Sequence, residues 1–242
     1  MEHRHTPITS DHDTPDKPRI PGWLEQKPKT KDINPSLLIY FLCILCTGFA
    51  HHSAVPAGFW VSNESIFTKH EYWRLLSALL VHADWGHLLA NSPLLLIFSW
   101  YLRTYFGLIM FPLVSLFAGG LTNLITVFYY PEAVRLVGAS GMVYAMVAMW
   151  LTLYTTYETR FSKLARMMRV LGFALVLMAP TTFKPETSYL AHGVGFLVGG
   201  ALALISIPFL KTPKQLPQSL WTQEQKNTYS NQEMEANLED KH

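Results

Sequence analysis

The most regular feature of this chain is a series of long apolar stretches that contain no charged side chain. Read between the nearest charged residues, they are Ile33–Asn63, Trp85–Leu102, Thr104–Pro131, Leu136–Tyr157, Val170–Phe183 and Thr187–Leu210. A helix needs about 20 apolar residues to cross the hydrocarbon core of a membrane. The fifth stretch is short for this, unless Arg166 and Arg169 extend their side chains to the headgroups. The pattern predicts an all-α membrane protein with six transmembrane helices.

The composition also indicates that the middle of the chain lies in a membrane. Half of the 242 residues are hydrophobic and 15% are charged, whereas soluble globular domains carry about 25% charged residues. Only 15 of the 36 Asp, Glu, Lys and Arg residues lie among the 175 positions from Ser36 to Leu210. A soluble domain needs more charge on its outward faces. We therefore expect the lipid bilayer to surround this part of the chain.

Polar segments flank the apolar middle at both ends. Residues 1–35 contain several prolines and no apolar core of a secretory signal peptide, and residues 211–242 show no sustained apolar stripe. We predict a disordered cytoplasmic tail over 1–35, a six-helix domain over 36–210 and a polar cytoplasmic tail over 211–242. The formal net charge of +2 does not indicate a nucleic-acid partner.

The distribution of Lys and Arg predicts the orientation of the helices, because cytoplasmic loops carry an excess of these residues. With six crossings, ten of them fall on the side of the termini and four on the opposite side. We therefore expect both termini in the cytoplasm. The ten are Lys27, Lys29, Lys31, Arg103, Arg160, Lys163, Arg166, Arg169, Lys211 and Lys214, and the four are Lys69, Arg74, Arg135 and Lys184.

Four polar residues inside the predicted helices are candidates for function, because hydrogen-bonding groups within a bilayer are costly unless they have partners. His87 and Asn91 are four residues apart in the second span and share one helical face. Ser140 opens the fourth span within Gly-Ala-Ser-Gly, and His192 opens the sixth. These three spans all enter from the non-cytoplasmic side. We therefore expect the four side chains at a similar depth.

A serine and a histidine at one depth favour nucleophilic catalysis. The Ser140 hydroxyl is a weak nucleophile until a base takes its proton, and His192 can be that base. The six stretches contain no Asp or Glu, so the pair forms a dyad and not a Ser-His-Asp triad. The Ser140 amide, the His87 ring and the Asn91 amide are candidate donors to an oxyanion. This chemistry fits peptide-bond hydrolysis without a cofactor or a metal ion.

Small residues suggest how the serine and histidine helices approach each other. Gly195 and Gly199 share the helical face of His192, and this spacing permits close contact between membrane helices. We expect Tyr144, one turn beyond Ser140, to pack against the His192 ring. The matching small residues of the fourth span are Gly141, Ala145 and Ala148.

A metal-dependent protease that uses His82, His87 and His192 is an alternative. On a regular helix, His82 and His87 would be about 140° apart, which is unfavourable for holding one ion. His70 and Glu71 do not continue into the H-E-x-x-H pattern of zinc proteases. The residues therefore favour the serine mechanism.

Two further patterns are interpreted without a chemical role. Cys43 and Cys46 form a C-x-x-C inside the first apolar stretch, where they suit helix packing better than redox chemistry. His3, His5 and His12 lie in the polar N-terminal segment without the partners or fixed spacing of a metal site.

Together, the motifs of this chain resemble those of the rhomboid family of intramembrane serine proteases. Four motifs occur in the family's order, each on the expected span or loop, from about Pro35 to Leu210. They are Trp73-Arg74, His82-x4-His87-x3-Asn91, Gly138-Ala-Ser140-Gly141 and Ala191-His192-x2-Gly195-x3-Gly199.

The resemblance implies a rhomboid-like bundle of six transmembrane helices that cleaves transmembrane protein substrates in or near their membrane segments. It implies that Ser140 is the nucleophile and that His192 acts as general base and then as general acid. His87 and Asn91 would donate to the oxyanion. The alternative is a catalytically silent rhomboid-like protein that binds membrane clients, although such relatives typically lack the serine or the histidine.

The resemblance also assigns roles outside the catalytic residues. Trp73 and Arg74 would belong to a first loop in the outer membrane interface, and the fifth span with Pro180–Thr187 would form a lateral gate. Pro93 removes a helix hydrogen bond and predicts a kink that could turn Asn91 away. The charge bias favours a bacterial inner membrane. The sequence does not indicate an oligomeric state.

Overall fold

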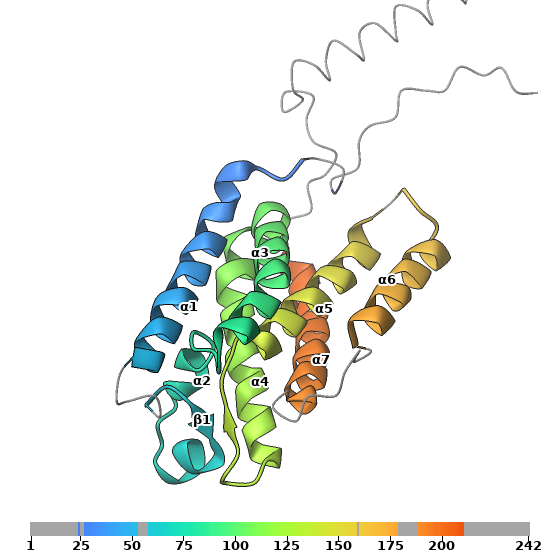
Figure 1. The fold of residues 1–242 in the computed structure, drawn as a ribbon. Coiled ribbons are helices and arrows are strands. Elements are labelled where there is room, and N and C mark those ends of the chain that lie inside the picture. Colours follow the sequence, from blue (N-terminus) through green and yellow to red (C-terminus); the bar gives the residue numbers. More distant parts are fainter. Residues whose placement is uncertain (1–23, 25–26, 53–57, 159, 179–187, 211–242) are drawn as a thin grey trace, which may run out of the picture. The chain divides into compact units, whose positions relative to one another are not determined.

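The computed structural model describes residues 24, 27–52, 58–158, 160–178 and 188–210 (Figure 1). These residues are mostly helical, as the apolar pattern predicts. The chain up to residue 23, the predicted gate loop Pro180–Thr187 and the chain from residue 211 lie outside the described residues.

The elements follow one another as a series of helices with two short strands. They are η2 (Thr30–Ile33), α1 (Asn34–His52), β1 (Val61–Ser62), η4 (Glu64–Thr68), α2 (Arg74–Ser77), α3 (Trp85–Leu108), η5 (Ile109–Val114), α4 (Ser115–Tyr129), β2 (Arg135–Leu136), α5 (Ser140–Tyr157), α6 (Lys163–Met178), α7 (Tyr189–Ser206) and η6 (Ile207–Phe209).

Helical structure begins earlier than the predicted boundary at residue 35. The helix η2 starts at Thr30, inside the segment that we expected to be disordered. Two contacts with α3 explain this: Asp32 forms an ion pair with Arg103 at 3.7 Å, and the Trp100 indole donates to the carbonyl of Lys29 at 3.0 Å.

Each of the six predicted stretches contains part of a long helix, and α3 extends from the second stretch into the third. Within the described residues, three helical stretches are long and apolar enough to cross a membrane: Thr30–His52, Trp85–Tyr129 and Tyr189–Phe209. The longest of them is interrupted at Gly107, whose φ of 81° breaks the helical backbone. Six crossings and two cytoplasmic termini therefore remain predictions.

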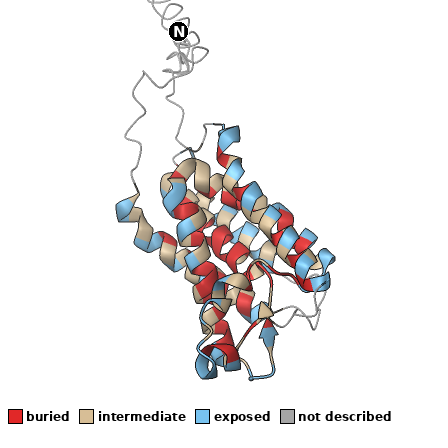
Figure 2. Cartoon of the chain, turned by 90° about the vertical axis from the view of Figure 1, so that its left-hand side faces the viewer, coloured by how far each residue is buried: buried red, intermediate tan, exposed pale blue. Residues whose placement is uncertain are grey.

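Large apolar side chains lie on the outside of the helices, as expected for a membrane protein. On α1, they recur every fourth residue at Leu37, Phe41, Leu45 and Phe49, which are 45–59% exposed. Exposed positions follow the outward sides of the helices, and buried positions face inward (Figure 2). Cys43 is buried on the inward side of α1 and is a free thiol, in agreement with a packing role.

Helix α5 lies at the centre of the bundle. It contacts α3, α4, α6 and α7, and ten of its 18 residues are buried. A helix that is enclosed by protein on most sides presents little surface to lipid. This explains why α5, which carries several Thr and Tyr residues, is not among the three most apolar stretches.

The closest helix contact joins α5 to α7 through small residues. A Cβ added to Gly195 would overlap the carbonyl oxygen of Gly141, and one added to Gly199 would overlap the carbonyl oxygen of Ala145. Backbone therefore packs directly on backbone, as membrane-helix pairs with small residues do. The predicted contact is confirmed at these two pairs of positions.

Helix α6 contrasts with α5, because none of its described residues is buried. Its first turn is tied to the end of α5 by a polar cluster. The Arg160 guanidinium pairs with the buried Glu158 carboxylate and holds the pKa of that carboxyl below its usual value. Arg166 donates to the carbonyls of Thr155 and Glu158.

The connection between α1 and α3 folds back toward the segment before α5. Strand β1 pairs antiparallel with β2, with Val61 opposite Leu136, and both residues belong to one small buried cluster. Arg74 fastens this connection by donating to Glu71 at 2.7 Å and to the carbonyls of Gly58 and Trp60. The pairing brings residues near 60 beside those near 135.

The close contact between α5 and α7 should contribute to the stability of the protein. We expect Gly199→Ala to lower the free energy of unfolding by about 1–3 kcal/mol, the usual cost of overpacking. Thermal unfolding in detergent micelles, followed by circular dichroism, measures this loss. Gly193→Ala is the matched control, because an added Cβ there meets nothing within 4 Å. Equal stability of the two variants would contradict the close backbone contact.

Candidate active site

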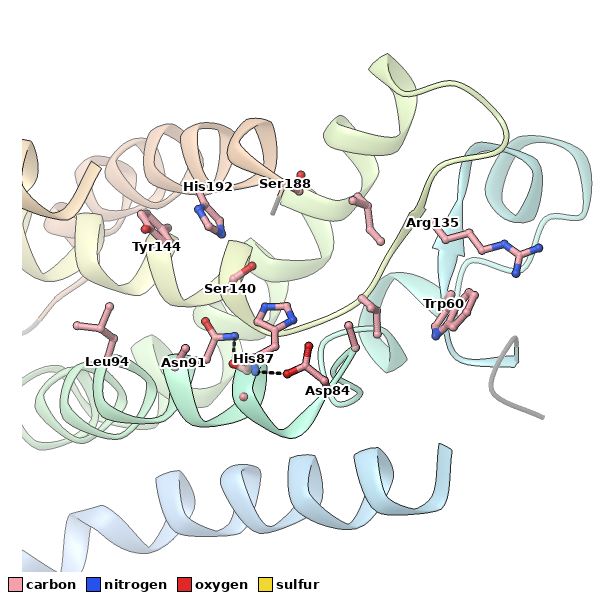
Figure 3. Close-up of a pocket in the computed structure, with 15 residues that line it drawn as sticks. Trp60, Asp84, His87, Asn91, Leu94, Arg135, Ser140, Tyr144, Ser188 and His192 are labelled. Atoms are coloured by element: carbon pink, nitrogen blue, oxygen red, sulfur yellow. Dashed lines mark hydrogen bonds between the residues drawn. The ribbon is translucent and has the colours of Figure 1, made fainter. Parts of the chain in front are cut away.

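A pocket of about 890 Å³ lies where the N-terminal ends of α3, α5 and α7 meet (Figure 3). All four sequence-predicted site residues line it: His87 and Asn91 from α3, Ser140 from α5 and His192 from α7. The structure therefore brings together side chains that are up to 105 positions apart in the sequence.

Ser140 is the first residue of α5, directly after a tight turn. Gly138 in this turn has a φ of 112°, which an L side chain rarely adopts. The first amides of a helix have no acceptor within the helix. The first amide that donates within α5 is that of Val143, which donates to the carbonyl of Ala139. The Ser140 amide precedes it in the chain and is therefore available to a ligand.

Glycine at position 138 is also required by its neighbour. A Cβ there would lie 2.7 Å from Cε1 of the His87 ring, closer than real contacts allow. The ring therefore packs directly against the backbone before Ser140. This contact places the α3 histidine beside the start of α5, as Figure 3 shows.

Helix α3 begins with a capped turn that orients His87 and Asn91. Asp84 is the N-cap, and its carboxylate accepts from the His87 amide at 2.7 Å. The Asn91 side chain donates to the carbonyl of His87 at 3.1 Å. The backbone angles at Pro93 are helical, since Gly107 is the one residue of α3 outside the helical range, and the kink at Pro93 stays a prediction. Asn91 remains in the pocket.

His192 is held in the first turn of α7 by stacking. Its ring lies 4.1 Å from the Tyr144 ring at an angle of 10°, which confirms the expected packing. The Tyr144 hydroxyl also donates to the carbonyl of Leu177 on α6 at 3.3 Å. Ser188 caps α7 by accepting from Ala191, and its hydroxyl lies 2.9 Å from that of Tyr130.

The pocket also contains residues that sequence reasoning missed: Trp60, Asp84, Arg135 and Ser188. Asp84 and Ser188 could have been found as N-caps, because Asp and Ser favour the position before a helix. Trp60 and Arg135 carry no such signal. The Arg135 guanidinium lies 5.1 Å from the centre of the Trp60 ring, and this contact depends on the pairing of β1 with β2.

The prediction that helix geometry separates His82 from His87 was wrong. His82 lies in the connection before α3, because Asp84 is the N-cap and the helix begins at Trp85. The two rings have centroids 5.2 Å apart. Within the described ranges, no group of three His, Cys, Asp or Glu residues could hold a metal ion. A site without metal stays a prediction.

Comparison with known proteins gives a consistent result. The family model of the Rhomboid domain matches residues 69–209, more than half of the chain. "RHOMBOID-like protein 2" of Arabidopsis thaliana is 28% identical over 137 residues, which are 57% of this chain and 43% of that protein. "RHOMBOID-like protein 6, mitochondrial" of the same plant is 28% identical over 162 residues, 65% of this chain and 49% of that protein.

A bacterial protein is also similar. The "Putative rhomboid protease YdcA" of Bacillus subtilis (strain 168) is 27% identical over 139 residues, which cover 57% of this chain and 68% of that protein. The chain spans less than half the length of the two plant relatives.

The turn before Ser140 should not tolerate a side chain at position 138. Gly138→Ala combines a left-handed backbone, which costs about 1–2 kcal/mol for an L residue, with displacement of the His87 ring. Gly107→Ala is the matched control, because its φ of 81° is also positive but its added Cβ meets nothing within 4 Å. We expect the larger drop in unfolding temperature for Gly138→Ala. Equal drops would show that His87 does not press on this turn.

Proposed function

The chain belongs to the rhomboid family, and from this premise we propose that it is an intramembrane serine endopeptidase. It would hydrolyse peptide bonds in or near the transmembrane segments of other membrane proteins, using Ser140 and His192 as a dyad. One observation carries the proposal: a serine, a histidine and two further polar side chains from three helices line one pocket.

The proposed reaction begins with Ser140. Its hydroxyl oxygen attacks the carbonyl carbon of the substrate peptide bond, while His192 accepts the hydroxyl proton. The tetrahedral intermediate collapses when the C–N bond breaks and His192 gives the proton to the leaving amine. Water then attacks the acyl carbon while His192 takes a proton from it. The C–O bond to Ser140 breaks, the substrate leaves with a new carboxyl end, and His192 returns the proton to the Ser140 oxygen.

Ser140 and His192 form no direct hydrogen bond with each other in the described part of the chain. Catalytic hydrogen bonds are often long in free enzymes and shorten when substrate binds. The stacked Tyr144 ring limits the movement of His192. A displacement of the serine side chain, and not of the base, would therefore complete the pair.

The negative charge of the intermediate would be stabilised by preorganised donors. The Ser140 amide at the start of α5 contributes a donor and the positive end of the helix dipole. The His87 ring and the Asn91 amide face the same pocket from α3. Asp84 binds the His87 backbone and not His192, so it is not the third member of a triad.

The apolar helices and the distribution of Lys and Arg together suggest how the protein lies in its membrane. We propose six crossings, since each of the six predicted stretches contains part of a long helix. The excess of Lys and Arg on one side supports two cytoplasmic termini and a bacterial inner membrane. A substrate helix must unwind to reach the serine. Gly or Pro near the cleaved bond would lower the cost of unwinding.

A fluorophosphonate probe applied to the detergent-solubilised protein tests the nucleophile. We expect wild-type protein to be labelled, Ser140→Ala to be unlabelled, and His192→Ala to react at least about 1,000-fold more slowly, as for other activated serines. Ser99→Ala is the control, because this hydroxyl is bonded to the carbonyl of Leu96 in its own helix.

The same experiment separates the alternatives. Labelling that survives Ser140→Ala would refute the serine assignment, and loss of substrate cleavage with a chelator would favour a metal protease. A folded wild-type protein that is neither labelled nor active would favour the catalytically silent rhomboid-like protein that binds membrane clients.

A separate prediction concerns the oxyanion donors. We expect His87→Ala and Asn91→Ala each to lower kcat by about 100- to 1,000-fold, the usual effect of removing one such donor, with little change in KM. Cleavage of a transmembrane substrate in micelles gives both constants. An unchanged kcat in a folded variant would remove that residue from the proposed oxyanion site.

A further inference from the structure

His82 is a buried histidine for which the proposed reaction has no use. It lies in the connection between α2 and α3, and its side chain is 1% exposed. Its ring Nε2 accepts a hydrogen bond from the Ala139 amide at 3.2 Å. Its backbone amide donates to the Thr47 hydroxyl of α1 at 3.1 Å. One residue thus joins α1 to the position before Ser140.

The turn before Ser140 is held at two consecutive amides by this connection. The Gly138 amide donates to the carbonyl of Ala78 at 2.8 Å, and the Ala139 amide donates to His82. Two fixed peptide planes determine the direction in which the chain enters α5. They therefore determine where the amide and the hydroxyl of Ser140 lie.

The chemistry of the ring is defined by this hydrogen bond. Because Nε2 accepts, the ring is neutral and its proton is on Nδ1. Burial, and to a smaller extent the neighbouring His87, lowers the pKa of His82 to about 3, so the ring keeps this acceptor at neutral pH. Nδ1 has no partner within the part of the chain that the structure describes.

The unpartnered Nδ1 argues against a role in packing alone. A buried donor without an acceptor is unfavourable, and an aliphatic side chain would fill the space without this penalty. The ring edge also abuts the His87 ring, at 5.2 Å between centroids and an angle of 78°. His82 therefore contacts both the Ala139 amide before α5 and the His87 ring of α3.

We propose that His82 is a positioning residue, which holds the Ala139 amide through Nε2 and thereby sets the position of the Ser140 amide and hydroxyl. The inference rests on the proposed function of Ser140. An oxyanion donor must lie within a few tenths of an ångström of its working distance, and a misplacement of about 1 Å can cost a factor of 100 in rate.

The test compares two substitutions in the full-length protein in detergent micelles. His82→Leu removes the acceptor and keeps an apolar side chain, whereas His82→Gln offers an amide oxygen in place of Nε2. The measurements are kcat and KM for a transmembrane substrate, the rate of fluorophosphonate labelling at Ser140, and the unfolding temperature.

We expect His82→Leu to lower kcat and the labelling rate by about 10- to 100-fold, as a displaced reacting group does, with KM within a factor of about two. His82→Gln should recover most of both rates. A structural role alone would change the unfolding temperature but not the rates of the folded protein, and it would not depend on an acceptor.

Thr47→Val keeps the proposal testable if His82→Leu does not fold. It removes the acceptor for the His82 amide from α1, and we expect a several-fold loss of labelling rate. Thr126→Val is the matched control, because this buried hydroxyl donates only to the carbonyl of Thr122 in its own helix.

The outcomes distinguish this proposal from the proposed function. Wild-type rates in a folded His82→Leu protein would overturn the positioning role and leave the serine protease intact. Rates that fall only in proportion to the folded fraction, without recovery in His82→Gln, would overturn it as well. Absence of Ser140 labelling in the wild-type protein would instead refute the proposed function, and the positioning role with it.

Discussion

The direct backbone contact between α5 and α7 is the constraint on which the rest of the structure depends. Apolar side chains gain little by leaving lipid for protein, so membrane helices associate by close packing and hydrogen bonds. Gly195 and Gly199 provide this packing against Gly141 and Ala145. Because Ser140 and His192 lie in the first turns of these two helices, the same contact determines how closely the proposed nucleophile and base can approach.

The pocket combines this contact with the ends of helices. Helix N-termini carry unpaired amides, and in an apolar environment these need polar partners. At two of the three helix starts around the pocket, a side chain accepts a hydrogen bond from a free amide: Asp84 at the start of α3 and Ser188 at the start of α7. At the third, before Ser140, the amides of the turn are bound by the connection that contains His82. The polar residues therefore serve both the backbone and the proposed chemistry.

The bundle is unevenly stabilised around the pocket. Helix α5 is mostly buried, whereas α6 has no buried residue among those described. Besides the Arg160–Glu158 cluster before its start, the described contacts of α6 include the hydrogen bond from Tyr144 to Leu177 and the contact of Phe98 with Phe173 at 6.1 Å. Displacing α6 would therefore expose less buried surface than displacing α7, in which Ala191, Gly195, Gly199 and Ala203 are buried.

The sequence alone determined the apolar helices, the small residues between α5 and α7, and the polar residues Ser140, His192, His87 and Asn91, because helical periodicity and membrane burial are local properties. Tertiary structure decided the rest. It placed His82 outside α3 and beside the turn before Ser140, and it brought Trp60 next to Arg135 in the pocket. These contacts join irregular segments from distant parts of the chain. Such segments have no repeating pattern from which a neighbour could be predicted, so only the folded backbone shows which of their side chains meet.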